Sequence, residues 1–258
     1  MSGKKLVALL SMVLVLAGTC GYAAATSIFI GHDTSQLERE YQKDGTFIQT
    51  WGAIGSATGA AIEGGNLYIV NPSFGNNRIE RRGPGNTDQG LIVATVNGQW
   101  IEDLGNFGGG FILAGTFEGN VFKINTADGS FVPLFGTGKS YIGVTFDGAN
   151  IWTTGGLTDN FVYKRALDGS ILGSFDAGEA SGGIGYDPDD GTLWIGHFGG
   201  KVTHHLQDGT LLGGFTTGFG NYLDGLELGT VGAVDRVPGP ASLVLLLLGS
   251  GLLYFRRR

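Results

Sequence analysis

Little of this 258-residue chain is charged, and very little of it is cysteine or proline. There is one cysteine and there are six prolines, and only 15% of the residues are Asp, Glu, Lys or Arg. A single cysteine excludes a disulfide within the chain and a metal site built from several thiolates. Residues 26–236 show no helical period of apolar residues, which disfavours an α-helical domain.

Basic residues are also scarce where a domain would lie. Five of the 16 Lys and Arg lie near the two ends, which leaves residues 26–236 with 11 of them against 23 Asp and Glu. Because a nucleic-acid-binding surface needs a basic stripe, no nucleic-acid partner is predicted. No cofactor is predicted either, although so acidic a surface leaves weak binding of a divalent cation open.

Glycine, in contrast, is abundant at 49 residues. Those glycines follow no G-X-Y period, which excludes collagen. A hydrophobic content of 42% with 11% aromatic residues argues against disorder. The glycines therefore indicate many turns between many short strands.

The N-terminus has the features of a secretory signal. Lys4 and Lys5 precede an apolar run over residues 6–17, and small residues follow as far as Ala25. This order predicts a signal peptide over residues 1–25 that takes Cys20, the only cysteine, with it. The mature protein would then be exported and would contain no thiol.

The C-terminus, residues 237–258, has three parts. The motif Val237, Pro238, Gly239, Pro240 precedes 15 mainly apolar residues, 241–255, and the chain ends in Arg256, Arg257 and Arg258. The apolar stretch predicts a transmembrane helix of roughly 22 Å, and the arginines are expected on the cytoplasmic side.

This tail resembles the PEP-CTERM sorting signal of Gram-negative bacteria, with Gly239 where that family usually has Glu. The resemblance implies an exosortase-type processing enzyme as a partner and at least transient anchoring in the inner membrane. It also implies delivery to the periplasm, the cell surface or an extracellular matrix that is often rich in exopolysaccharide.

A unit of about 40 residues repeats between the two ends. Asp-Gly turns at Asp44, Asp128, Asp168 and Asp208 lie between strand-like runs, and the last three are evenly spaced at that period. A further turn is expected at Asp88-Gln89-Gly90. Since each unit holds about four short strands, the fold class predicted is an all-β propeller, with a β-sandwich as the alternative.

The blade count follows from where the units begin and end. Complete units lie near 57–96, 97–138, 139–178 and 179–218, and residues 27–56 lack a first strand. A lone strand at 224–228 would supply it, so the sequence predicts five four-stranded blades closed by the N- and C-terminal strands. Closure removes the sheet edges that an open array would expose.

The clearest unit runs from Gly183-Ile184-Gly185-Tyr186-Asp187 through Leu193-Trp194-Ile195 to Asp208-Gly209. It resembles the NHL and streptogramin-lyase-like propellers, which usually have six or seven blades. That superfamily includes lyases, lactonases and plain binding platforms, so the likeness supports a fold rather than an activity.

Two histidines are the main catalytic candidates. His32 and His197 each follow Ile-Gly at the end of a second strand, and ring closure would make their blades neighbours. Two imidazoles could bind a metal or act as acid and base. The alternative is that both are blade-rim residues without a role. His204 and His205 are adjacent in one strand and should point to opposite faces.

Ligand-binding candidates lie after second strands and between blades. They are Asn71, Trp100, Glu102, Tyr141, Tyr222 and Asp224. Aromatic rings beside carboxylates suit the stacking and hydrogen bonding of sugars, although packing between blades would also explain the aromatic residues.

The function predicted is therefore that of an exported, surface- or matrix-directed binding module for a polysaccharide or a protein. The alternative is a secreted propeller lyase or hydrolase with its site near His32 and His197.

Overall fold

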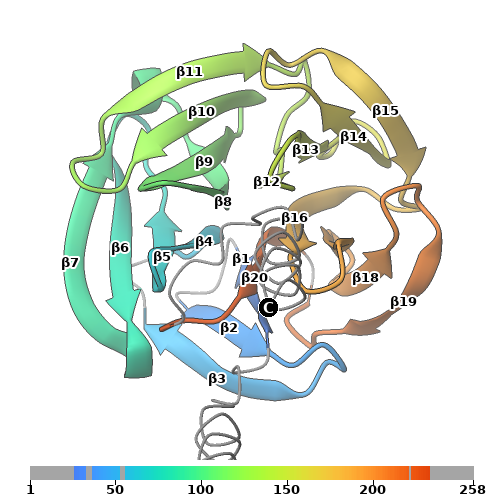
Figure 1. Ribbon diagram of the computed structural model, residues 1–258, viewed down its shortest axis with the longest axis horizontal. Coiled ribbons are helices and arrows are strands. Elements are labelled where there is room, and N and C mark those ends of the chain that lie inside the picture. The colour runs from blue at the N-terminus through green and yellow to red at the C-terminus, as the bar shows by residue number, and fades with distance from the viewer. Residues whose placement is uncertain (1–25, 33–36, 53–55, 221, 233–258) are drawn as a thin grey trace, which may run out of the picture.

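A computed structural model describes residues 26–32, 37–52, 56–220 and 222–232. These residues form a ring of five four-stranded sheets, which confirms the predicted five-bladed, all-β propeller (Figure 1). The predicted signal peptide (1–25) and sorting tail (237–258) lie outside them. In the part of the chain that is described, no helix is long and apolar enough to span a membrane.

The first blade joins the two ends of the chain. From the axis outward it holds β20 (Leu223–Gly229), β1 (Ser27–His32), β2 (Leu37–Tyr41) and β3 (Phe47–Gly52). The antiparallel register sets Ile28 opposite Leu228 and Ile30 opposite Leu226, and all four side chains are buried. The closure predicted from the lone C-terminal strand is thus confirmed.

The other four blades follow in chain order. The second and third hold β4 (Gly59–Glu63), β5 (Asn66–Asn71), β6 (Asn77–Gly83), β7 (Thr87–Ala94), β8 (Ile101–Gly108), β9 (Phe111–Thr116), β10 (Asn120–Asn125) and β11 (Phe131–Gly136). The fourth and fifth hold β12 (Val144–Phe146), β13 (Ile151–Thr154), β14 (Phe161–Arg165), β15 (Ile171–Asp176), β16 (Ser181–Asp187), β17 (Thr192–His197), β18 (Lys201–His205) and β19 (Leu211–Thr216). Two short 3-10 turns, η1 (Pro84–Asn86) and η2 (Val96–Gly98), are the helical elements among the described residues.

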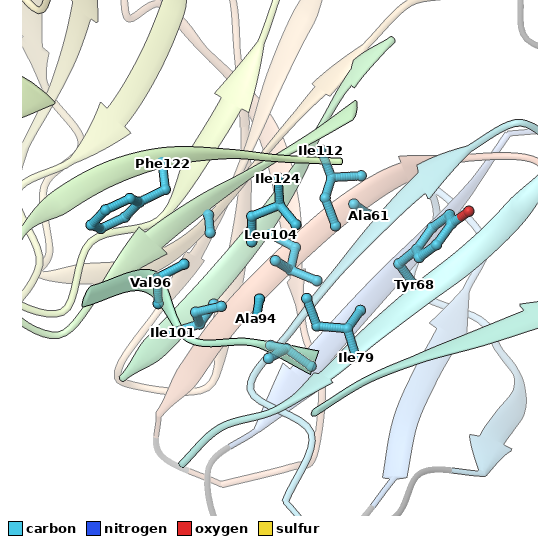
Figure 2. Close-up of a cluster of buried hydrophobic side chains, with 12 residues drawn as sticks. Ala61, Tyr68, Ile79, Ala94, Val96, Ile101, Leu104, Ile112, Phe122 and Ile124 are labelled. Atoms are coloured by element: carbon cyan, nitrogen blue, oxygen red, sulfur yellow. The ribbon is translucent and has the colours of Figure 1, made fainter. Parts of the chain in front are cut away.

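The hydrophobic core lies between neighbouring blades rather than inside one of them. Figure 2 shows the cluster between the second and third blades, to which Ile79, Leu104 and Phe122 belong, all buried. Each sheet alternates its side chains between two neighbours, so both faces are apolar. That double burial explains why many strands appear in the sequence as continuous apolar runs.

The Asp-Gly turns join the third strand of a blade to the fourth. In the fourth blade, Asp168 Oδ1 accepts the amide of Ser170 at 2.9 Å. Gly169, which lies between these two residues, has a φ of +87°. A Cβ added to it would lie 2.5 Å from the ring of Phe135 in the third blade. Two reasons therefore require glycine at this position: its backbone has a positive φ, and a side chain would clash with Phe135.

In the second blade the predicted turn is wrong. The turn is η1, and Asp88, Gln89 and Gly90 lie within β7. Pro84 and the left-handed Gly85 form this turn, with φ of +66° at Gly85, so a different local sequence replaces the Asp-Gly pair.

The first strands of the blades crowd round the axis, which Figure 1 shows as the centre of the ring. A Cβ added to Gly225 would lie 2.3 Å from Gly59 Cα and 2.4 Å from the carbonyl oxygen of Thr58. Backbone from two blades therefore meets directly here, and no side chain separates the strands.

Two carboxyl groups are buried beside this glycine contact. Asp103 Oδ1 and Oδ2 accept the amides of Leu104 at 2.8 Å and Val144 at 3.1 Å, which links the third blade to the fourth. Glu227 accepts the amide of Asn106 at 3.0 Å, which links the first blade to the third. Burial raises the pKa of Glu227 to about 8 and raises the pKa of Asp103 well above its usual value.

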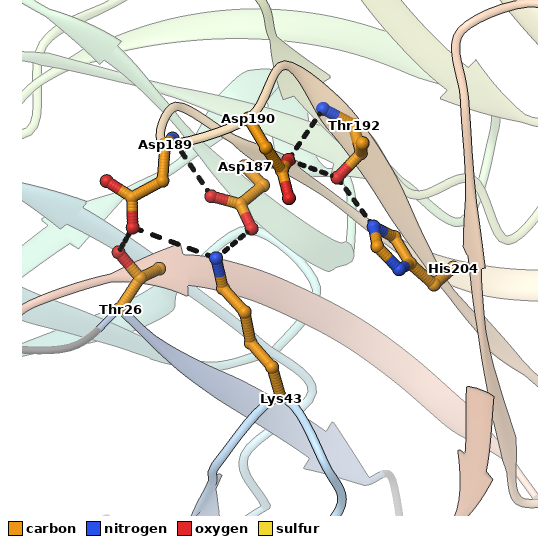
Figure 3. Close-up of polar contacts among 7 residues, drawn as sticks. All are labelled: Thr26, Lys43, Asp187, Asp189, Asp190, Thr192 and His204. Carbon is orange, nitrogen blue, oxygen red and sulfur yellow. Dashed lines mark hydrogen bonds and ion pairs between the residues drawn. The ribbon is translucent and has the colours of Figure 1, made fainter. Parts of the chain in front are cut away.

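A polar cluster fastens the first blade to the fifth at the opposite end from the blade-joining loops (Figure 3). Lys43, in the turn between β2 and β3, forms an ion pair with Asp187 and lies 3.7 Å from Asp189. The acidic stretch 187–191 is thus the turn between β16 and β17. Asp190 Oδ1 accepts the hydroxyl of Thr192 at 2.5 Å, and His204 Nε2 lies 2.7 Å from the same hydroxyl.

Candidate functional site

Two kinds of loop share one end of the ring, which we call the loop face. Because the strands of a blade alternate in direction, the loop after each second strand and the loop leading to the next blade emerge together. In the described chain they are residues 56–58, 72–76, 95–100, 117–119, 137–143, 155–160, 177–180, 198–200, 217–220 and 222. The loop face is where the sequence predicts ligand contacts.

Three pairs of aromatic rings lie on the loop face. Each pair joins a ring from the loop after a second strand to a ring from the following blade-joining loop. Their centroid distances and interplanar angles are 5.3 Å and 56° for Phe74–Trp100, 4.3 Å and 60° for Phe117–Tyr141, and 5.7 Å and 59° for Phe198–Tyr222. We refer to these six residues as the aromatic pairs.

Backbone hydrogen bonds hold two of the pairs together. Tyr141 donates its amide to the carbonyl of Phe117 at 3.1 Å, and Tyr222 donates its amide to the carbonyl of Phe198 at 2.8 Å. The amide of Phe117 in turn bonds the carbonyl of Trp100 at 2.9 Å. The rings are therefore positioned by connected backbone rather than carried on free loop tips.

Six ligand-binding candidates came from the sequence, and the structure separates them. Trp100, Tyr141 and Tyr222 lie on the loop face, each beside a phenylalanine. Asn71 ends β5 opposite Arg78 and is half-buried.

The two acidic candidates lie deeper. The side chains of Glu102 and Asp224 belong to the first strands β8 and β20 and are only 4% and 3% exposed. A ligand resting on the loop face would meet the aromatic rings and not these carboxylates.

The two candidate histidines end equivalent strands of neighbouring blades, as predicted, and both are buried. The ring of His32 stacks on Phe219 at 5.2 Å. His197 Nδ1 lies 3.3 Å from the carbonyl of Glu179, and its Nε2 lies 2.7 Å from the hydroxyl of Thr203.

Burial lowers the pKa of His197, which keeps its imidazole neutral near pH 7. The described residues contain no group of three or more His, Cys, Asp or Glu side chains that could hold a metal ion. His204 and His205 do point to opposite faces, one stacked on Trp194 and the other against Phe175.

Sequence reasoning missed the phenylalanine of every aromatic pair. The signal that could have found two of them is spacing, because the interval from Phe117 to Tyr141 equals the interval from Phe198 to Tyr222. In the remaining pair, the interval from Phe74 to Trp100 is slightly longer. In the fourth blade Gly156 and Ala180 stand in the corresponding loops at the interval of the two matching pairs, so no aromatic pair forms there.

Glu38 was also missed, and it is the most unusual buried group in the first blade. It is fully buried, and neither of its carboxylate oxygens has a hydrogen-bond partner among the residues that the structure describes. Burial raises its pKa well above the usual value. The corresponding residue in the third, fourth and fifth blades is a buried valine: Val121, Val162 and Val202.

Replacing Glu38 with the residue of its sister blades is expected to stabilise the protein. Glu38→Val removes a buried acid without a donor, so the free energy of unfolding at pH 7 should rise by about 1–3 kcal/mol. Glu40→Val is the matched control, because Glu40 accepts bonds from Gln49 and Trp51, and this change should destabilise. Chemical denaturation of the three proteins measures both effects, and a Glu38→Val protein less stable than wild type would contradict the prediction.

Comparisons with known proteins bear on the fold. No family model matches the chain, and no curated protein does. A solved structure of a protein of unknown function from Bacteroides caccae is similar over 80% of this chain and 99% of its own, with a TM-score of 0.51 at 10% identity. A structure of the mitotic checkpoint complex is similar over 76% of this chain and 65% of its own, with a TM-score of 0.47 at 14% identity. Because so few residues are identical, the first likeness is one of fold alone.

Proposed function

We propose that this protein is an exported binding module whose loop face takes a polysaccharide or a protein, and that residues 237–258 direct it to the cell surface or matrix. The aromatic pairs carry the binding part of the proposal. Three blades present partly exposed rings on one face, and backbone hydrogen bonds hold two of the three pairs together. Aromatic residues of this kind supply large contact areas at low entropic cost.

The sorting part rests on the three-part tail: the Val237–Pro240 motif, the apolar segment and the terminal arginines. An exosortase-type enzyme would recognise the motif, and the apolar segment would hold the chain in the inner membrane until processing. The propeller would then face the periplasm or the exterior, with the arginines inside.

Fractionation tests the sorting role. In a Gram-negative host with an exosortase-type enzyme, the full chain is expected in the membrane and surface fractions, and a chain ending at residue 236 in the soluble periplasm. A Pro238→Ala, Pro240→Ala chain keeps the apolar segment and should stay membrane-bound without processing. Identical fractionation of the full and shortened chains would contradict the role of the tail.

A further inference from the structure

The two tyrosines of the aromatic pairs share a backbone conformation that side chains rarely adopt. Tyr141 has a φ of +57° and Tyr222 a φ of +71°. They occupy equivalent places, since each stands in a blade-joining loop and donates its amide to the paired phenylalanine. A left-handed conformation is less favourable for a residue with a Cβ than for glycine.

Glycine adopts positive φ without this penalty, but the protein does not have glycine at these two positions. Twenty-four glycines of the described chain adopt positive φ, whereas only five other residues do. Keeping tyrosine twice at equivalent left-handed positions means that the ring itself is retained against a conformational cost. Strain of this kind is typical of functional sites.

The pairs leave much of their ring surface open. Phe74 is 64% exposed and Tyr222 is 49% exposed, while Trp100 is half-buried. The two rings of each pair meet at an angle of 56° to 60°, and the exposed rings of Phe74 and Tyr222 offer a face to a ligand. An open aromatic face suits the flat C–H surface of a pyranose ring, which is apolar although the sugar is soluble.

Charge narrows the class of polysaccharide. Residues 26–236 hold 11 basic and 23 acidic side chains, so the net negative charge of the domain disfavours an anionic glycan. The glycan that fits is neutral. Repetition of the pairs in three blades suits a polymer, because linked weak sites gain affinity through effective concentration.

From these observations we infer that each aromatic pair is a stacking subsite for sugar rings of a neutral polysaccharide, and that the subsites act together on one polymer. This inference rests on the proposed binding function and names the ligand class of the same face. It assigns contact to the rings of Trp100, Tyr141 and Tyr222 and none to the buried Glu102 and Asp224.

Affinity electrophoresis of the purified chain in gels containing hydroxyethyl cellulose, galactomannan or alginate tests the inference. Retardation is expected in at least one neutral gel and not in alginate. Trp100→Ala and Tyr222→Gly should each weaken binding at least threefold, and the double variant more than tenfold. Phe47→Ala is the matched control, because Phe47 is 51% exposed and packs on Tyr41 at the other end of the ring.

Two further readouts separate a binding role from a packing role. Tyr222→Gly relieves the left-handed strain, so its Tm should stay within about 3 °C of wild type while binding falls. Trp51, Trp152 and Trp194 are buried, so a shift of tryptophan emission on adding polymer reports on Trp100. A Tyr222→Gly protein that loses Tm and keeps its affinity would overturn the inference, as would the absence of retardation in both neutral gels.

Treated cell envelopes of the host distinguish failure of the inference from failure of the proposed function. Binding lost after periodate, which cleaves sugar diols, and kept after protease supports the inference. Binding lost only after protease, and still sensitive to the loop-face variants, overturns the glycan ligand and leaves the binding function standing. Binding to envelopes that none of the loop-face variants alters would overturn both.

Discussion

Adding one methyl group at the axis, in Gly225→Ala, is expected to lower the stability of this protein by about 3 kcal/mol or more. The new Cβ would lie 2.3 Å from Gly59 Cα and 2.4 Å from the carbonyl oxygen of Thr58. Both obstacles are backbone, so no side chain can rotate away. Since β20 closes the ring, the strain falls on the pairing that joins the two ends.

Thermal unfolding followed by circular dichroism measures this effect, with an expected fall in Tm of about 6–12 °C for a domain of this size. Gly173→Ala is the matched control, because a Cβ there meets nothing within 4 Å and Gly173 lies in the outer strand β15. Its Tm should change little. Equal effects of the two substitutions would contradict a tightly packed axis.

The second large effect is a loss of stability as the pH rises, caused by Glu227. Burial raises the pKa of Glu227 from 4.5 to about 8 in the folded protein. Below pH 4.5 folded and unfolded chains both hold the proton. Between the two values the unfolded chain releases it and the folded chain does not, so folding becomes less favourable with each pH unit, by about 5 kcal/mol in total.

The measurement is best made between pH 7 and 8.5, above the titration of the histidines. Burial lowers the pKa values of His197, His204 and His205, so their stabilising effect is complete above pH 6.5 and is lost on acidification. In this window Glu227 should by itself lower the wild-type free energy of unfolding by about 1 kcal/mol per pH unit up to pH 8, on top of what the buried acids Asp103 and Glu38 contribute.

Glu227→Gln should remove the Glu227 part of that slope, because an amide does not ionise. It also replaces one acceptor for the amides of Asn106 and Leu228, which costs about 1 kcal/mol at every pH and leaves the slope unaffected. Glu118→Gln, at an exposed loop position, is the control and should keep the wild-type slope. Urea denaturation at three pH values decides between them, and an unchanged slope in Glu227→Gln would contradict the assignment.

Much of the fold could be predicted because it depends on residues that are close together in the chain. Asp-Gly pairs set four of the five outer turns, since the aspartate accepts a nearby amide and the glycine accepts a positive φ. The second blade departed from the pattern because Pro84 and Gly85 form its turn instead. The closing strand was also predictable, because residues 27–56 lacked a first strand and the strand predicted at 224–228 belonged to no other unit.

Less of the candidate site could be predicted, for a physical reason. Trp100, Tyr141 and Tyr222 were identified by type and position, but each phenylalanine partner stands earlier in the chain, with two strands between it and its pair. Glu102 and Asp224 had the right chemistry for a ligand, yet the structure buries them. Exposure depends on how closely neighbouring blades approach, which no local pattern specifies.

Chain order, repeat length and turn chemistry are properties of the sequence alone, because each depends on residues close together in the chain. They determined an all-β ring of five blades and the place where it closes. The tertiary structure decided which side chains meet across blades: the aromatic pairs, the glycine contact at the axis, the buried carboxyl groups of Asp103 and Glu227, and Glu38 in a valine's place. Those contacts join residues far apart in the chain, so they exist only once the ring has formed.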